Sequence, residues 1–161
     1  MSNGAKMTYW AGAHLSAHIA AIAPVGATPN IEDIFPPLTK PVSMRHYHGL
    51  ADAWAPYTGG PQRGTGHLRS VSDTIRLWRT LNHVKKDPRV VRHKGGVRET
   101  IYGDQGHTPI VALVTIAGLG HRWPGDLSLP WRDDLFGPRS AAVDATKEIV
   151  QFFLSQTGDT P

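Results

Sequence analysis

The sequence predicts a single α/β domain over residues 1–161, with a mostly parallel sheet, flanking helices and a β-hairpin. Three observations support this prediction. Short, uniformly apolar runs suit strands that are buried on both faces. Segments with helical spacing of apolar residues lie between these runs, and one alternating segment surrounds a pair of glycines, as in a hairpin. A chain of 161 residues is long enough to bury one substantial core.

In the first third of the chain, one helix and two strands are expected. Helical spacing of apolar residues covers 4–19, and Ser2 or Asn3 can cap the start of this helix. The run "AAIAPV" (20–25) is apolar throughout and ends at Pro and Gly, which is typical of a buried strand. The segment "VSMRHYHG" (42–49) is the second strand, and a long loop follows it.

The remaining elements follow from the same rules. Residues 70–84 form an amphipathic pattern with a Ser/Asp start, which predicts a helix. Residues 89–103 alternate around a central Gly-Gly pair, which indicates a hairpin. The segment "IVALVTIAG" (110–118) is the strongest strand, and residues 141–156 are expected to close the chain as a helix.

Composition excludes several classes of protein. With no cysteine, the chain has no disulfide framework, thiolate zinc site or cysteine nucleophile. The net charge is +4, and the basic run at 85–98 lacks aromatic residues that would stack on bases, so we expect a solvated surface and no nucleic-acid partner. No apolar run approaches the roughly 18 residues of a membrane span. We expect a cytoplasmic protein as written, or a secreted one if a longer N-terminus carries a signal peptide.

Three polar residues follow the predicted elements in a meaningful order. Ser2 precedes the first helix, Asp52 follows the second strand, and His121 follows the strongest strand. Catalytic groups of α/β proteins gather at the carboxyl ends of parallel strands. The chain order Ser, Asp, His is that of the α/β-hydrolase triad, so the pattern favours a serine hydrolase site. Taken singly, each residue is more typical of a helix cap, a turn or a structural histidine.

Several sequence motifs extend this interpretation. In chain order they are "SNGAKMTY", "AAIAPVGAT", "HGLADAWAPYTGG", "VSDTIRLW", "RETIYG" and "GLGHRWPG". Over residues 2 to about 154 the chain resembles the polyhydroxybutyrate depolymerase-like esterases, a group that includes feruloyl and acetylxylan esterases. The resemblance implies an α/β-hydrolase fold, no cofactor, and cleavage of esters of short hydroxyacid polymers or plant acyl groups.

Specific residues match the motifs of that family. The resemblance implies that Ser2 is the nucleophile of a Gly-x-Ser-x-Gly turn, Asp52 the acid and His121 the base. It also implies that the backbone N–H of Asn3 is an oxyanion donor. Gly4 would close the turn, where the absence of a Cβ lets neighbouring backbone approach.

Aromatic residues flank the expected acid and base. Trp54 and Tyr57 lie in the acid loop, and Trp123 and Trp131 lie near the base. They are interpreted either as the substrate-binding wall of an acyl or aromatic pocket or as packing within the loops. Small soluble esters are the expected substrates, because no segment predicts a polymer-binding groove.

The chain also departs from the family pattern. The first glycine of the serine turn and the strands before it have no counterpart, so the chain is expected to be the C-terminal portion of a hydrolase domain. The run at 20–25 would then be an exposed sheet edge, through which a homodimer could form. Three explanations stay open: part of a longer product with impaired activity alone, a half-hydrolase completed by dimerisation, or a non-catalytic remnant acting as a binding or assembly module.

Other histidines and glycines have less specific patterns. His14 and His18 are four residues apart on one helical face, and His46 and His48 share one face of a strand. Both pairs are expected to be structural, and no metal site is predicted. The glycine-rich segment at 59–66 is expected to be a flexible loop, because it lacks the pattern of a phosphate-binding loop.

Overall fold

The fold is that of a computed structural model, which describes residues 1–62, 66–103, 109–128 and 132–156. The helices are α1 (Asn3–His14), α2 (Val71–Leu81), α3 (Asp133–Phe136) and α4 (Ala145–Ser155). The strands are β1 (Ala21–Ile22), β2 (Ser43–Gly49), β3 (Gly60–Gln62), β4 (Gly66–Leu68), β5 (Arg89–Lys94), β6 (Val97–Tyr102) and β7 (Val111–Ile116). The chain is therefore a mixed α/β protein, as the sequence predicts. None of the helices in the described ranges is long and apolar enough to cross a membrane.

The main sheet has five strands in the order β1-β2-β7-β6-β5. The pairings β1–β2 and β2–β7 are parallel, whereas β7–β6 and β6–β5 are antiparallel. The prediction of a mostly parallel sheet therefore needs correction, and the sheet is mixed. The reason is that the predicted hairpin belongs to the main sheet. Its second strand, β6, pairs antiparallel with β7 along its whole length, from Val97 opposite Ile116 to Tyr102 opposite Val111.

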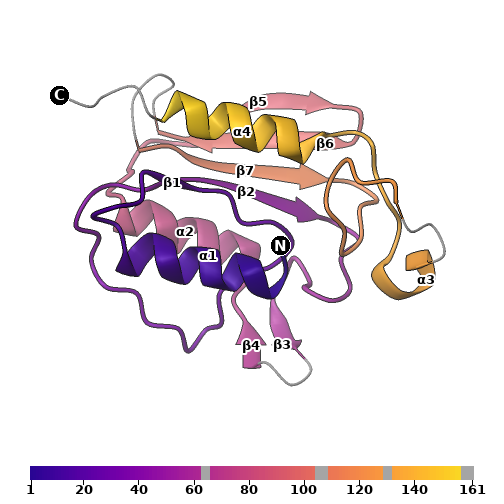
Figure 1. Ribbon diagram of the computed structural model, residues 1–161, viewed down its shortest axis with the longest axis horizontal. Helices are drawn as coiled ribbons and strands as arrows, with labels where there is room; N and C mark the ends of the chain where they lie inside the picture. Colours follow the sequence, from indigo (N-terminus) through magenta and orange to yellow (C-terminus); the bar gives the residue numbers. More distant parts are fainter. Residues whose placement is uncertain (63–65, 104–108, 129–131, 157–161) are drawn as a thin grey trace.

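Helices cover both faces of this sheet. Figure 1 shows α1 and α2 side by side on one face and α4 on the other. Strand alternation divides the core accordingly, because successive side chains of a strand point to opposite faces. Met44 on β2 packs with Trp78 of α2 in one cluster, and Tyr47 on the same strand packs with Ile149 of α4 in the other.

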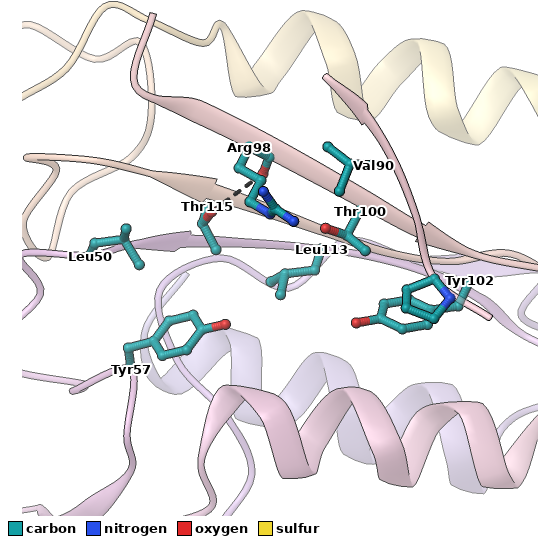
Figure 2. Close-up of a pocket in the computed structure, with 9 residues that line it drawn as sticks. Leu50, Tyr57, Val90, Arg98, Thr100, Tyr102, Leu113 and Thr115 are labelled. Atoms are coloured by element: carbon teal, nitrogen blue, oxygen red, sulfur yellow. Dashed lines mark hydrogen bonds between the residues drawn. The ribbon is translucent and has the colours of Figure 1, made fainter. Parts of the chain in front are cut away.

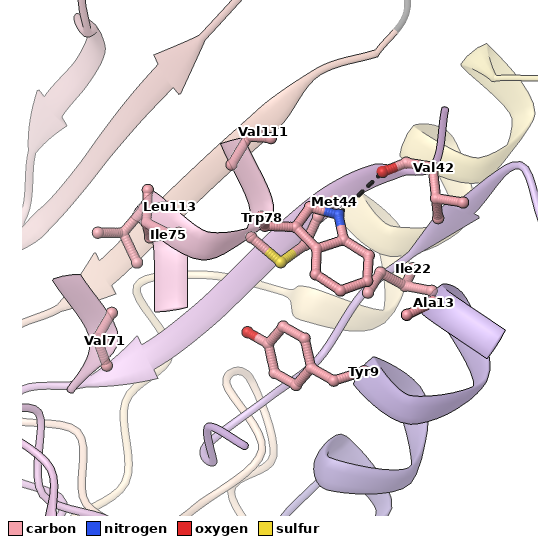
Figure 3. Packing of buried hydrophobic residues seen from close by; sticks show 10 residues of the cluster. All are labelled: Tyr9, Ala13, Ile22, Val42, Met44, Val71, Ile75, Trp78, Val111 and Leu113. Atoms are coloured by element: carbon pink, nitrogen blue, oxygen red, sulfur yellow. Dashed lines mark hydrogen bonds between the residues drawn. The ribbon is translucent and has the colours of Figure 1, made fainter. Parts of the chain in front are cut away.

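The core beneath α1 and α2 centres on Trp78. Its indole N–H donates to the Val42 carbonyl at 2.9 Å, and its ring meets the Tyr9 ring edge to face at 5.6 Å. Figure 3 shows these rings between the two helices and the strands, together with Met44. Both aromatic side chains are completely buried, so this cluster fixes α1 against the sheet.

Local sequence signals explain the better-defined element ends. Ser70 caps α2 by accepting the Asp73 N–H at 3.0 Å, and Asp144 caps α4 by accepting the Lys147 N–H at 3.0 Å. The turn between β5 and β6 has φ values of 61° and 76° at its two glycines. Such positive values are those of a tight hairpin turn, so the hairpin prediction is confirmed.

Other predictions were less accurate. The first helix ends at His14 rather than near residue 19, and β1 is only two residues long, although Val25 forms a further parallel bridge to Tyr47. Residues expected to form a flexible loop instead include the paired strands β3 and β4. On α4, Phe152 is buried, whereas the adjacent Phe153 is 39% exposed.

The fold places the start of the chain beside the carboxyl ends of the parallel strands. Figure 1 shows the N-terminus next to the carboxyl ends of β2 and β7, on the side where α3 lies. The backbone N–H of Ser2 donates to the Val25 carbonyl at 3.1 Å, directly after β1. The first residues therefore lie at the edge of the sheet where parallel strands present their following loops.

Candidate active site

Ser2, Asp52 and His121 form one chain of hydrogen bonds. The Ser2 Oγ lies 3.0 Å from His121 Nε2, and His121 Nδ1 lies 2.8 Å from Asp52 Oδ2. Asp52 and His121 are buried, with 5% and 7% of their surface exposed, whereas Ser2 is more accessible. The structure therefore brings together three side chains that are 69 and 119 residues apart along the chain.

Ser2 has a strained backbone. Its φ of 55° and ψ of −128° lie in a region that residues with a Cβ rarely adopt. Hydrogen bonds hold this conformation on both sides. The Ser2 N–H donates to Val25, and the Ser2 carbonyl accepts from the N–H of Ala5 at 2.8 Å and of Lys6 at 3.3 Å. The hydroxyl therefore projects from a sharp turn at the start of α1, as expected for an exposed nucleophile.

Backbone amides fix the carboxylate of Asp52. Its Oδ1 accepts from the N–H of Trp54 at 2.9 Å and of Ala55 at 2.8 Å, which leaves Oδ2 for His121. The loop is anchored to the base loop as well, because the Ala51 N–H donates to the Leu119 carbonyl at 3.0 Å. Both oxygens of the buried carboxylate thus have partners, as a buried charge requires.

Glycines let the loop of His121 approach its neighbours. A Cβ on Gly49, the last residue of β2, would lie 2.2 Å from the Leu119 carbonyl oxygen, and one on Gly120 would lie 2.3 Å from that of Phe136. Neither backbone contact tolerates a side chain. The His121 N–H completes the arrangement by donating to Phe136 at 2.6 Å. The base is therefore held by close backbone packing on two sides.

Sequence reasoning missed Gly26 and misjudged Gly4. Gly26 has a φ of 61°, and a Cβ there would lie 3.7 Å from Asp52 Oδ2 and 3.8 Å from His121 Nδ1. This glycine therefore lies against the acid–base pair. Its only sequence signal was its position directly after an apolar strand. By contrast, a Cβ on Gly4 would meet nothing within 4 Å, so the expected close approach of backbone at that residue is wrong.

The amino end of α1 faces the same site. Asn3 is the first residue of this helix, so its N–H is one of those that have no acceptor within the helix. It directly follows the Ser2 hydroxyl in sequence, and the helix dipole favours negative charge at this end. An oxyanion on a carbonyl attacked by Ser2 could be stabilised there.

Of the four predicted wall residues, the structure places Trp54 against the base. The ring of Trp54 stacks over the His121 ring with centroids 6.2 Å apart, and its indole N–H donates to the Leu135 carbonyl at 2.7 Å. Trp54 is 47% exposed, so a ligand can reach its ring. Trp123 packs instead toward α4, where its indole N–H donates to Thr146 at 3.0 Å. Trp131 lies outside the described residues.

Tyr57 faces a different cavity. It lines a cleft of about 540 Å³ beside strands β5 to β7, together with Leu50, Arg98 and Tyr102. Figure 2 shows the Tyr57 and Tyr102 side chains directed into this cleft. None of the residues that line it belongs to the group Ser2, Asp52 and His121. The structure therefore does not bring Tyr57 to the triad.

Three of the four histidines in the predicted pairs have structural partners, whereas His18 lies beyond the end of α1 and does not share a helical face with His14. His14 is exposed and stacks on Trp10 at 4.3 Å, while His46 and His48 are buried and joined by a 3.0 Å hydrogen bond. In the described part of the chain, no group of three or more His, Cys, Asp or Glu side chains is arranged to hold a metal ion.

Comparisons with known proteins add no relatives. No protein-family model matches the chain, and no curated protein matches it significantly.

Proposed function

We propose that this chain is a serine carboxylic ester hydrolase that works through an acyl-enzyme intermediate. One observation carries the proposal. The Ser2 hydroxyl, the His121 imidazole and the Asp52 carboxylate lie in one continuous chain with contacts of 3.0 Å and 2.8 Å, and Ser2 is held in a strained turn at a helix start. The strained backbone at a serine costs about 1–3 kcal/mol, and a serine with a purely structural role has no need of that conformation.

The geometry defines the role of each side chain in acylation. Asp52 Oδ2 accepts a hydrogen bond from the Nδ1–H of His121, which leaves Nε2 free to take the Ser2 proton. As Ser2 Oγ bonds to the ester carbonyl carbon, its proton moves to Nε2, and Asp52 stabilises the imidazolium. The Asn3 N–H faces the developing oxyanion. When the tetrahedral intermediate collapses, the bond to the alcohol oxygen breaks and that oxygen takes the proton from Nε2.

Deacylation repeats these steps with water. His121 removes a proton from water as the water oxygen bonds to the acyl carbon. The new intermediate breaks its bond to Ser2 Oγ, which takes the proton back from His121. The carboxylic acid leaves, and the site returns to its first state with atoms and protons balanced.

We also propose that the architecture belongs to the α/β-hydrolase type. Supporting this, the parallel strands β1, β2 and β7 are neighbours in the sheet, and one triad residue lies near each of them at the same edge. The acid follows β2 and the base follows β7, in the order typical of that fold. The exposed indole of Trp54 beside the base supports an ester with an apolar acyl group as the substrate.

Hydrolysis of p-nitrophenyl acetate tests the function. We expect measurable turnover by the wild-type chain and a loss of at least about 10³-fold in kcat for Ser2→Ala, because the variant lacks the nucleophile. Ser72→Ala is the matched control, since Ser72 is an exposed serine on α2.

Covalent labelling separates an enzyme from a binding module. A fluorophosphonate ester should lose fluoride and add its phosphonyl group to Ser2 Oγ, which intact-mass and peptide mass spectrometry detect. Ser72→Ala should label as the wild type does and Ser2→Ala should not. A folded wild-type chain that neither labels nor hydrolyses the ester would contradict the proposal and favour a non-catalytic module.

A further inference from the structure

A second chain of hydrogen bonds runs beneath the triad and is not used by the mechanism above. The Tyr9 hydroxyl lies 2.8 Å from His46 Nδ1, and His46 Nε2 lies 3.0 Å from His48 Nδ1. His48 Nε2 then lies 2.8 Å from the carbonyl oxygen of Ala55. All of these residues are at most 1% exposed. We call this set (Tyr9, His46, His48 and the Ala55 carbonyl) the histidine relay.

The direction of every bond in the histidine relay is determined by its last member. The Ala55 carbonyl can only accept, so His48 Nε2 carries a proton. In a neutral ring, His48 Nδ1 then accepts from His46 Nε2, which leaves His46 Nδ1 to accept from the Tyr9 hydroxyl. Each ring nitrogen therefore has one partner of the right kind.

Burial favours this neutral arrangement. Desolvation lowers the pKa of His46 well below its usual value, and the neighbouring His48 lowers it further. Desolvation also lowers the pKa of His48, where His121 acts in the same direction while the Ala55 carbonyl and Asp52 oppose it. Both rings therefore stay uncharged near neutral pH.

The two ends of the histidine relay lie on the two segments that must be aligned for catalysis. Tyr9 is on α1, seven residues or about two helical turns after Ser2, so both lie on one side of that helix. Ala55 is in the acid loop, and its N–H donates to Asp52 Oδ1 at 2.8 Å. The same Ala55 packs in a small apolar cluster with Ala5, in the first turns of α1.

We propose that His46 and His48 are positioning residues. They hold the Ala55 backbone so that the Asp52 carboxylate stays hydrogen-bonded to His121 and the His121 ring stays within reach of Ser2. The inference rests on the proposed esterase function. Ala55 has its carbonyl held by His48 while its N–H holds the carboxylate, so a shift of this residue moves Asp52. A displacement of about 1 Å in a catalytic group can reduce a rate about 10²-fold.

Two substitutions of His48 separate positioning from simple core packing. In His48→Gln, the longer amide places an N–H near the position of Nε2, so it can still donate to Ala55. In His48→Asn, the shorter amide can pair with His46 but cannot reach Ala55. Both variants lose one buried partner, so both should be less stable than the wild type.

Hydrogen exchange of the Trp54 and Ala55 amides is the first readout, because both N–H groups bind Asp52. We expect His48→Asn to speed their exchange at least tenfold relative to the amides of β7, and His48→Gln to keep them within about threefold of the wild type. With p-nitrophenyl acetate, kcat should fall about 10²-fold in His48→Asn with little change in KM, and His48→Gln should recover most of this loss.

Control variants distinguish a loss of positioning from a general loss of core stability. Ile75→Val loosens the same core and changes no member of the histidine relay, so it should lower stability and leave the ratio of exchange rates unchanged. Should His48→Asn not fold, Tyr9→Phe removes only the hydroxyl at the far end and should also speed exchange of the two amides. Equal behaviour of His48→Asn and His48→Gln, or unchanged amides in the variant that folds, would overturn the inference. An inactive wild type would refute the esterase function alone, since exchange needs no turnover.

Discussion

At the scale of single residues, the site depends on how Asp52 is held. Its two oxygens have different tasks, because Oδ1 accepts from two backbone amides and Oδ2 accepts from His121. The amides keep the carboxylate from rotating, and the carboxylate in turn selects the tautomer of His121 that leaves Nε2 free for Ser2. The position of the Asp52 carboxylate therefore determines whether His121 can accept the proton of Ser2.

Replacement of Asp52 by Asn tests this dependence. The amide has nearly the same shape, but it can present an N–H to His121 Nδ1 and so favour the unproductive tautomer. We expect kcat for p-nitrophenyl acetate to fall by about 10⁴-fold, with little change in KM. Circular dichroism should show a folded chain at the assay temperature. A loss of less than tenfold would contradict the role assigned to Asp52.

At the scale of elements, charged side chains join α4 to the sheet. Glu148 of α4 contacts Arg92 of β5 at 2.7 Å, Arg45 of β2 at 3.2 Å and the Tyr47 hydroxyl at 3.1 Å. Arg45 also reaches Glu99 of β6 at 2.8 Å. These groups are mostly buried, so removal of one member leaves its partners without compensation. The network ties the last helix to three strands of the sheet.

Removal of the Glu148 carboxylate should therefore destabilise the chain. We expect Glu148→Gln to lower the free energy of unfolding by about 1–2 kcal/mol, after allowance for partial solvent screening. Urea denaturation measures this change, and Gln151→Ala at an exposed position of α4 is the control. Burial acts to raise the pKa of Glu148, but the hydrogen bond and charge of Arg92 outweigh it, and the pKa is lowered. The stabilisation is thus present at neutral pH and is lost only as pH falls through this lowered pKa.

The elements also show what the sequence could predict. Strands β6 and β7 were predictable because their alternating and apolar patterns match their burial. Strand β5 is exposed along most of its length and was indicated by the glycine pair that follows it. Strands β3 and β4 have no such pattern. They depend on distant contacts, such as the Arg69 N–H to the Pro29 carbonyl at 2.9 Å, which no local rule anticipates. The histidine relay was hidden for the same reason, because the spacing of His46 and His48 shows a shared face but not the partner Tyr9.

At the scale of the whole molecule, the two core clusters lie on opposite faces of one sheet, and the triad lies at the edge where both layers end. The chain order of the triad was readable from the sequence. Its assembly was not, because it depends on Gly26, on the strained turn at Ser2 and on close backbone contacts of Gly49 and Gly120. The roles of these residues become clear only once distant segments are in contact.

Stability of the whole chain should depend on pH through His46 and His48. Both have a pKa lowered from the usual 6.5, so they are neutral in the folded chain, whereas the unfolded chain binds protons below about pH 6.5. The stabilisation is complete above this pH and decreases as pH falls, by up to about 1.4 kcal/mol per pH unit for each ring. Urea denaturation between pH 7.5 and 5 should show this slope.

The control for this slope is a variant that changes no titratable group. Gln151→Ala should leave the pH dependence unchanged, whereas His48→Gln should reduce it, because one buried titrating ring is gone. A free energy of unfolding that is constant between pH 7.5 and 5 would contradict the buried, neutral state of the two rings.

The distance along the chain between the triad residues has a consequence for folding kinetics. Ser2 and His121 are separated by 119 residues, so the ribosome must add a long segment after Ser2 before its hydroxyl can meet the His121 ring. Contacts of such long range form slowly, because a large loop has to be closed first. Recovery of the proposed esterase activity during refolding should therefore lag behind the return of helical signal, so that activity would report on the completion of folding.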